Sequence, residues 1–108
     1  MLPAVGACRT TDKCTALIVE ADYRVVGFTV YKLKDETGEV VLLAVHPEFQ
    51  RCGIATQLNQ AALDAMKAAG MKMAVAETGG EESHAAARRA YEKAGYTGLP
   101  LVRYFKDL

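Results

Sequence analysis

The residues best suited to do chemistry form one short segment between a predicted strand and a predicted helix. The segment reads Gln50, Arg51, Cys52, Gly53, Ile54 and Ala55. A loop that ends on a helix N-terminus presents backbone N–H groups that lack partners, and the helix dipole adds positive potential there. Gly53 has no side chain to keep a phosphate away. This pattern indicates an anion site, although a glycine that only eases the turn from strand to helix explains it too.

Tyr91 is the second residue whose position suggests chemistry. It lies one helical turn after Ala87, so the two residues share one face of a predicted helix. An aromatic residue at this spacing is usually part of a core, with its hydroxyl at the rim. The alternative is that Tyr91 donates a proton to a reacting group. The segment by itself leaves both interpretations open.

Runs of β-branched and aromatic residues predict the strands that must position these segments. Residues 16–21 and 25–31, separated by a polar turn, predict an antiparallel hairpin. The run at 39–45 is apolar without alternation, which predicts a strand that is buried on both faces and a sheet that helices cover. Residues 71–76 and 99–105 predict two further strands, and residues 1–15 predict a loop or one short strand.

Two predicted helices separate these strands. Apolar residues recur at spacings of three and four over 54–69, and a second helix runs from about 83 to 94; a glycine follows each. The strands at 39–45 and 71–76 are joined by a helix and therefore run parallel. The predicted fold class is α/β or α+β, with a mixed, mostly antiparallel sheet, a central parallel pair and flanking helices.

Composition narrows the classes of protein to be considered. The 108 residues are 51% hydrophobic and 24% charged, which is typical of a globular domain and argues against disorder. Lys+Arg and Asp+Glu number 13 each, so there is no basic excess for coating a nucleic acid. No apolar run reaches the roughly 18 residues of a membrane helix. We expect one domain over 1–108, with a short N-terminal part at 1–15 and a core at 16–108.

The cysteines and histidines predict neither a disulfide framework nor a structural metal. Cys8, Cys14 and Cys52 are odd in number and widely spaced. His46 and His84 do not stand at zinc-ligand spacing from them. The first residues have neither the basic leader nor the apolar core of a signal peptide. Together these features predict a cytoplasmic protein.

Taken together, the two chemical segments resemble the GNAT superfamily of acetyl-CoA-dependent N-acetyltransferases. The motifs V-H-P at 45–47 and Q-x-x-G-x-A at 50–55 match that family's strand end and phosphate loop. The motif A-x-x-x-Y-x-K-x-G-Y at 87–96 matches its later helix. The resemblance covers roughly residues 16–108, and the two motifs stand in the family's order with the expected strand pattern between them.

The resemblance implies a role for each of these positions. The N–H groups of the loop would hold the pyrophosphate of CoA, and the strand at 43–45 would pair with the pantetheine arm. In the family a bulge splays this strand from the next one, and a backbone N–H, here one near Val45, would polarise the thioester carbonyl. Tyr91 would protonate the departing thiolate. The residues implied to bind the cofactor are Leu43, Ala44, Val45, Gln50, Arg51, Cys52, Gly53, Ile54, Ala55, His84, Ala87 and Lys93.

The acceptor amine must lose a proton, and a carboxylate would help. An amine with a pKa near 10 is mostly protonated at pH 7. Glu39 stands where many family members have a strand glutamate, and Glu77, at the end of the next strand, is the other candidate base. A solvated charge at a strand end also explains either residue.

Two departures from the family bear on the site. His84 stands where the family usually has Asn, and an imidazole can donate a similar hydrogen bond. Only 15 residues precede Ala16, whereas family members usually have a strand and two helices there that wall the acceptor site. A second subunit, bound through an exposed apolar sheet face, would supply that wall. A large accessible amine, such as a protein lysine or N-terminus, would need none.

We therefore expect a homodimeric N-acetyltransferase that transfers acetyl from acetyl-CoA to a primary amine by direct attack in a ternary complex. The first alternative is a non-catalytic acyl-CoA-binding module that lacks a complete acceptor site. The second is an interaction protein that has kept only the fold. Turnover separates the first alternative from the enzyme, and CoA binding separates the second from both.

Overall fold

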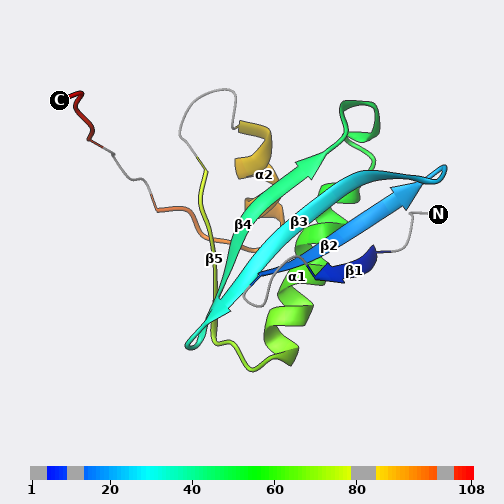
Figure 1. Cartoon of the computed structure of the whole chain (residues 1–108). Coiled ribbons are helices and arrows are strands. Elements are labelled where there is room, and N and C mark those ends of the chain that lie inside the picture. The colour runs from blue at the N-terminus through cyan, green and yellow to red at the C-terminus, as the bar shows by residue number, and fades with distance from the viewer. Residues whose placement is uncertain (1–4, 10–13, 79–84, 100–103) are drawn as a thin grey trace.

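The described residues of the chain form a five-stranded mixed sheet with two helices (Figure 1). A computed structural model describes residues 5–9, 14–78, 85–99 and 104–108. The strands lie in sequence order, β1 to β5, and neighbours are antiparallel except for the parallel pair β4 and β5. Their bounds are β1 Val5–Arg9, β2 Cys14–Ala21, β3 Arg24–Lys34, β4 Thr37–Val45 and β5 Met73–Ala76. The mixed sheet, the hairpin and the parallel pair are confirmed.

The helices agree with the sequence pattern and end where it predicts. Helix α1 spans Ile54–Ala68 and helix α2 spans Ala85–Lys93, and a short 3-10 turn, η1 (Pro47–Phe49), precedes α1. Gly70 and Gly95 follow the helices with φ of 85° and 99°, the left-handed conformation that glycine adopts without a steric penalty. The start of the second helix, predicted at Ser83, lies outside the described residues.

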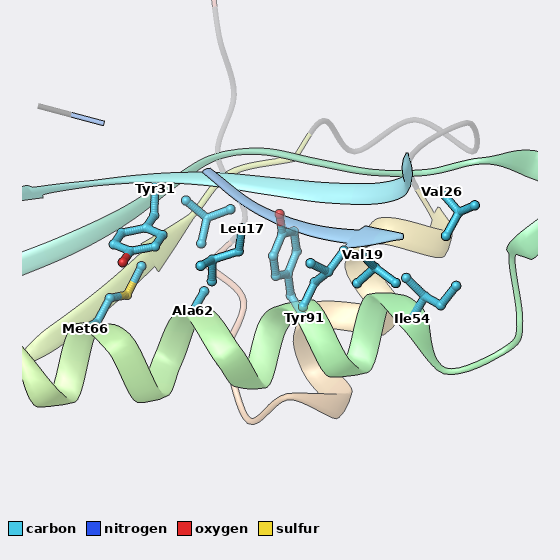
Figure 2. Close-up of a cluster of buried hydrophobic side chains, with 10 residues drawn as sticks. Leu17, Val19, Val26, Tyr31, Ile54, Ala62, Met66 and Tyr91 are labelled. Carbon is cyan, nitrogen blue, oxygen red and sulfur yellow. The ribbon is translucent and has the colours of Figure 1, made fainter. Parts of the chain in front are cut away.

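Both helices pack on the same side of the sheet, and the core lies between the sheet and the helices (Figures 1 and 2). Leu58, Ala62 and Met66 recur every four residues along α1, so they form one buried stripe. Figure 2 shows Ala62 and Met66 of this stripe facing the strands, with Tyr91 of α2 completing the layer. The strand residues buried in this core are Leu17, Val19, Val26, Tyr31 and Val40.

The opposite face of the sheet is largely open. Val25, Val41 and Leu42 expose between 45% and 55% of their surface. The prediction that the strand at 39–45 is buried on both faces is therefore wrong for its second half. The physical reason is that both described helices pack on the core face of the sheet, so no described helix covers this side of the strand.

Two further observations concern the ends of the chain. Residues 1–15 contain the strand β1, one of the two options that the sequence left open. The strand predicted at 99–105 is not formed by its described residues, and 100–103 lie outside the described part. Within the described chain β5 is therefore the outermost strand, and the parallel pair predicted at the centre of the sheet lies at its edge. Neither described helix combines the length and the apolar character needed to cross a bilayer.

Candidate active site

Strand β4 changes its neighbours halfway along its length. Its first half pairs with β5 in parallel, and the last pair joins Val40 to Ala76. On the other side, Tyr31 of β3 pairs with Val40, but the next β3 residue, Val30, pairs with Leu42. Val41 is thus an extra residue, a β-bulge that bends the strand. Beyond the bulge, β4 pairs with β3 alone, so β4 and β5 part from each other after Val40 and Ala76.

The second half of β4 therefore has a free edge. The N–H of His46 donates to Val26 O at 2.7 Å, which shows that this residue faces β3. Because backbone groups alternate in direction along a strand, the N–H and C=O groups of Leu43 and Val45 face the opposite, free edge. Consistently, the side chain of Gln50 reaches this edge and donates from Nε2 to Val45 O at 3.1 Å. An extended ligand can pair with such an edge as an added strand.

The loop after β4 ends on an uncapped helix. Gly53 is the N-cap of α1 with φ 84°, and among the described residues no side-chain capping hydrogen bond is found there. Arg51 also has a positive φ, 63°, and it is exposed together with Cys52. Ile54, which is 2% exposed, fixes the first turn of α1 in the core. The loop thus has the open N–H groups and the positive helix end that suit an anion.

Tyr91 is a buried residue of α2, as the core interpretation predicted. Its ring lies edge-to-face with that of Tyr96, with ring centroids 5.4 Å apart, and its side chain points toward the sheet (Figure 2). Burial raises the pKa of Tyr91 above its usual value of 10.0, and the neighbouring Tyr96 adds to the rise. Tyr91 therefore remains a hydrogen-bond donor over the whole neutral range. Its helical neighbour Ala87 is half-buried against the same core, and Lys93 is exposed in the last turn.

The two candidate bases differ in position. Glu39 lies in the paired half of β4, opposite Val75, and its carboxylate is 3.5 Å from Lys32 Nζ. Glu77 follows Ala76 directly and is exposed, so it lies where β4 and β5 part. His84, the other predicted contact of the cofactor, lies outside the described residues. Among the residues that are described, no three His, Cys, Asp or Glu side chains are grouped so that they could hold a metal ion.

Most of the predicted site residues are thus gathered around one feature, the free edge of β4 and the loop that follows it. Sequence reasoning missed the location of the bulge at Val41 and the part of Thr29, whose buried hydroxyl donates to Leu42 O on the β3 side of this strand. The run from Val40 to Val45 is apolar throughout, so it has no alternation that would reveal a change of register.

Residues 4–96 match the family model of the acetyltransferase (GNAT) family, and the chain belongs to this family. N-alpha-acetyltransferase 30 of Schizosaccharomyces pombe is 41% identical over 69 residues, which are 63% of this chain and 45% of that protein. The chain therefore spans under half the length of this curated relative.

Solved structures of acetyltransferases share the fold. The aminoglycoside acetyltransferase AAC(6')-Iy, solved with a bisubstrate analogue of CoA, superposes with a TM-score of 0.75 at 18% identity, covering 91% of this chain and 71% of that one. The 6'-N-acetyltransferase AAC(6')-IG of Acinetobacter haemolyticus gives a TM-score of 0.75 at 16% identity, covering 91% and 72%. At these identities the likeness is one of fold.

Proposed function

We propose that the protein is an N-acetyltransferase that uses acetyl-CoA and acts on the α-amine of a protein or peptide. One observation carries the proposal: the free edge of β4 at Leu43 and Val45 leads directly into the uncapped N-terminus of α1 at Gly53. The first feature suits an extended amide chain and the second suits a phosphate. CoA has both groups, joined in this order. Family membership supports the same assignment.

In this proposal the chain's backbone does most of the binding. N–H groups between Arg51 and Ala55 hold the pyrophosphate, while the backbone of Val45 and the C=O of Leu43 pair with the pantetheine amides. Gln50 must release Val45 O, to which it donates at 3.1 Å, when an added strand takes that place. Ala87 and Lys93 lie on α2, whose exposed last turn carries a positive charge near the cofactor's polar end. Bound acetyl-CoA supplies the thioester that the acceptor amine attacks.

Three groups of the chain act on the reacting atoms in this proposal. A backbone N–H of the free edge donates to the thioester carbonyl oxygen as negative charge grows there. Tyr91 donates its phenol hydrogen to the leaving sulfur. Because a thiol has a pKa of about 8.5 and that of Tyr91 lies above 10, the phenol shares its proton with the thiolate rather than losing it. A carboxylate takes the proton that the amine loses, through water.

Glu77 is the carboxylate that we assign as the base. It follows Ala76 at the point where β4 and β5 part, and no ion pair with it is found among the described residues. Glu39 stands four residues before Leu43, about 13 Å away along an extended strand, and its carboxylate engages Lys32. Glu39 is therefore better placed to stabilise the sheet than to accept the proton.

The α-amine is the acceptor that this site suits best. At pH 7 roughly one α-amine in ten is neutral, whereas only roughly one lysine side chain in 2,500 is neutral. An α-amine therefore needs less help from a base. The open sheet face beside the site offers no wall against a large substrate. The name of the S. pombe relative, an N-alpha-acetyltransferase, supports the same acceptor class.

The proposal includes a cytoplasmic homodimer built as one domain per chain. The exposed apolar residues Val25, Val41 and Leu42 form a surface that a second copy would cover. Cys52 is an exposed free thiol, which suits a reducing compartment. Light scattering at several protein concentrations measures the assembly, and a monomer at all of them would refute the dimer.

The second candidate function is a non-catalytic module that binds acyl-CoA. The same open face favours it, because no described segment encloses an acceptor there. Calorimetric titration with acetyl-CoA and release of free CoA in the presence of acceptors separate the possibilities. The acceptors are a peptide with a free N-terminus, the same peptide with a blocked N-terminus and an internal lysine, and an aminoglycoside. CoA release with the first peptide alone supports the enzyme; binding without release with any of them supports the module; no binding refutes both.

A further inference from the structure

Thr29 is a fully buried polar residue at the bulge of β4. It lies on β3, its exposed fraction is 0%, and its hydroxyl donates to Leu42 O at 2.9 Å. Leu42 is the residue that directly follows the extra residue Val41. The bond therefore reaches across from β3 to the first peptide group of β4 beyond the bulge.

The direction of this bond determines what the other side of the same peptide does. A trans peptide is planar, and its C=O and N–H point in opposite directions. A hydroxyl that holds Leu42 C=O toward β3 thereby turns the N–H of Leu43 toward the free edge of β4. A hydrogen bond accepted at the carbonyl also polarises the peptide, which makes its N–H a better donor.

The Thr29 bond adds to the backbone pairing of this peptide. Leu42 pairs with Val30 of β3 directly after the bulge, where the extra residue disrupts the regular ladder, and the hydroxyl supplies a further bond at this point. Leu43 has no neighbour from β5 on its other side. Among the described residues, the Thr29 hydroxyl is the side-chain group found to hold this peptide.

We infer that Thr29 is a positioning residue that aims the Leu43 N–H at the acyl carbonyl of the bound substrate. The inference rests on the proposed function and deepens it, because it selects Leu43 as the donor and names the side chain that orients it. Thr29 does not touch the substrate and acts only through the Leu42–Leu43 peptide. Its hydroxyl therefore affects the transition state more than the binding of CoA, which has no acyl carbonyl.

The test compares Thr29→Val with Thr29→Ser. Valine keeps the β-branched shape and removes the hydroxyl, whereas serine keeps the hydroxyl. Thr15→Val is the matched control, because Thr15 lies opposite Tyr31 on the same side of the sheet and away from the bulge. Each variant is first checked for the wild-type circular dichroism spectrum. The measurements are the amide proton shift of Leu43 by NMR with CoA and with acetyl-CoA, the Kd for CoA, and kcat.

In the wild type we expect acetyl-CoA to move the Leu43 amide proton further downfield than CoA does. Thr29→Val should lower kcat about tenfold, which is less than the 100-fold or more that removal of an oxyanion donor costs. It should also remove most of the extra shift and change the Kd for CoA by less than about twofold, whereas Thr29→Ser and Thr15→Val behave like the wild type.

The outcomes are distinct. A wild type that shows neither acetyl-CoA binding nor the extra shift refutes the proposed function and this inference with it. A wild type that shows both, while Thr29→Val retains kcat and the shift, refutes the inference alone. Equal losses of kcat and CoA affinity in Thr29→Val, or a loss in Thr29→Ser as large as in Thr29→Val, would assign Thr29 a merely structural role and also refute it.

Discussion

The two halves of β4 belong to one strand and have opposite surroundings. Residues 37–40 pair with β3 on one side and β5 on the other, and Val40 is 5% exposed. Beyond the bulge at Val41, the strand pairs with β3 alone, and Leu42 is 55% exposed. In the proposed function the first half belongs to the scaffold, and the second half offers a row of backbone groups to a ligand. A single extra residue, Val41, separates the half of β4 that pairs on both sides from the half that pairs with β3 alone.

This difference suggests how a fold can form a binding site from backbone groups instead of polar side chains. Peptide groups that the bulge leaves unpaired supply donors and acceptors, and the paired half keeps them in place. Substitutions in the second half and its loop should therefore change binding and turnover. Substitutions in the first half should change stability and leave the properties of the folded molecules intact.

The largest effect is expected for Gly53→Glu. The substitution places a side chain and a negative charge at the helix end where the phosphates are proposed to lie. CoA affinity should fall at least about 100-fold, which corresponds to roughly 2.7 kcal/mol. Isothermal titration calorimetry measures it.

Gly70→Glu is the matched control for this variant. Gly70 is also a glycine with a positive φ, 85°, at the other end of the same helix, and a Cβ there would meet nothing within 4 Å. The Gly70→Glu substitution introduces the same kind of backbone strain and the same charge, but far from the loop that begins α1. If Gly70→Glu weakened CoA binding as much as Gly53→Glu, the phosphate assignment of the loop would be lost.

Tyr91→Phe should give the next largest effect. It removes the donor to the leaving sulfur and keeps the ring that packs in the core. We expect kcat to fall by about 10- to 100-fold, the low end of acid–base contributions, with CoA affinity within about twofold. Steady-state kinetics together with a CoA titration separate the two quantities, and an equal loss of both would argue against the acid.

The pH dependence tests the same residue. Because burial raises the pKa of Tyr91 in the folded state, its neutral form favours folding, and this contribution is complete below pH 10. It is lost as the pH rises from 10 through the higher folded-state pKa. The melting temperature of the wild type should therefore fall as the pH rises through this alkaline range, and the melting temperature of Tyr91→Phe should fall less. Parallel curves for the two proteins would contradict the assignment.

Gly38→Ala tests the paired half of β4. A Cβ at Gly38 would come within 2.6 Å of Met66 Cγ and Sδ, so α1 has to move or Met66 has to change its rotamer. Overpacking of this kind costs about 1–3 kcal/mol of unfolding free energy. The Kd for CoA of the folded protein should stay the same. Gly6→Ala, where a Cβ meets nothing within 4 Å, is the control, and a weaker Kd for CoA in Gly38→Ala would erase the distinction between the two halves.

The smallest effect is expected for Glu77→Gln. An α-amine is already partly neutral at pH 7, so loss of a base should lower kcat only about 2- to 5-fold, and the loss should shrink as the pH rises. Glu39→Gln, which removes a half-exposed ion pair with Lys32, should cost at most about 1 kcal/mol of stability. If Glu39→Gln lowered kcat more than Glu77→Gln did, the two assignments would have to be exchanged.

Local patterns were sufficient to locate the elements of this fold. The spacing of Leu58, Ala62 and Met66 predicted the helix and its buried face, and the glycines after both helices predicted their ends. Two motifs, at 50–55 and 87–96, were sufficient to indicate the family. Each of these signals is contained in a few consecutive residues, because caps, helical stripes and loops are made by neighbours in the chain.

The strand at 39–45 shows where such reading fails. An uninterrupted apolar run looks the same whether a strand is buried on both faces or on one, and it conceals the register. Val41 and Leu42 are exposed because both described helices pack against the other face of the sheet, a fact about other parts of the chain. No pattern within 39–45 contains that information.

The sequence by itself determined the family, the order of the elements and the loop that begins α1, since these depend on residues close together in the chain. Only the tertiary structure decided where β4 and β5 part, which backbone groups face the free edge, and that Thr29 reaches the peptide after the bulge. These depend on the register between strands and on contacts between residues far apart, such as Thr29 and Leu42. Register is a property of the paired strands together, and no single segment specifies it.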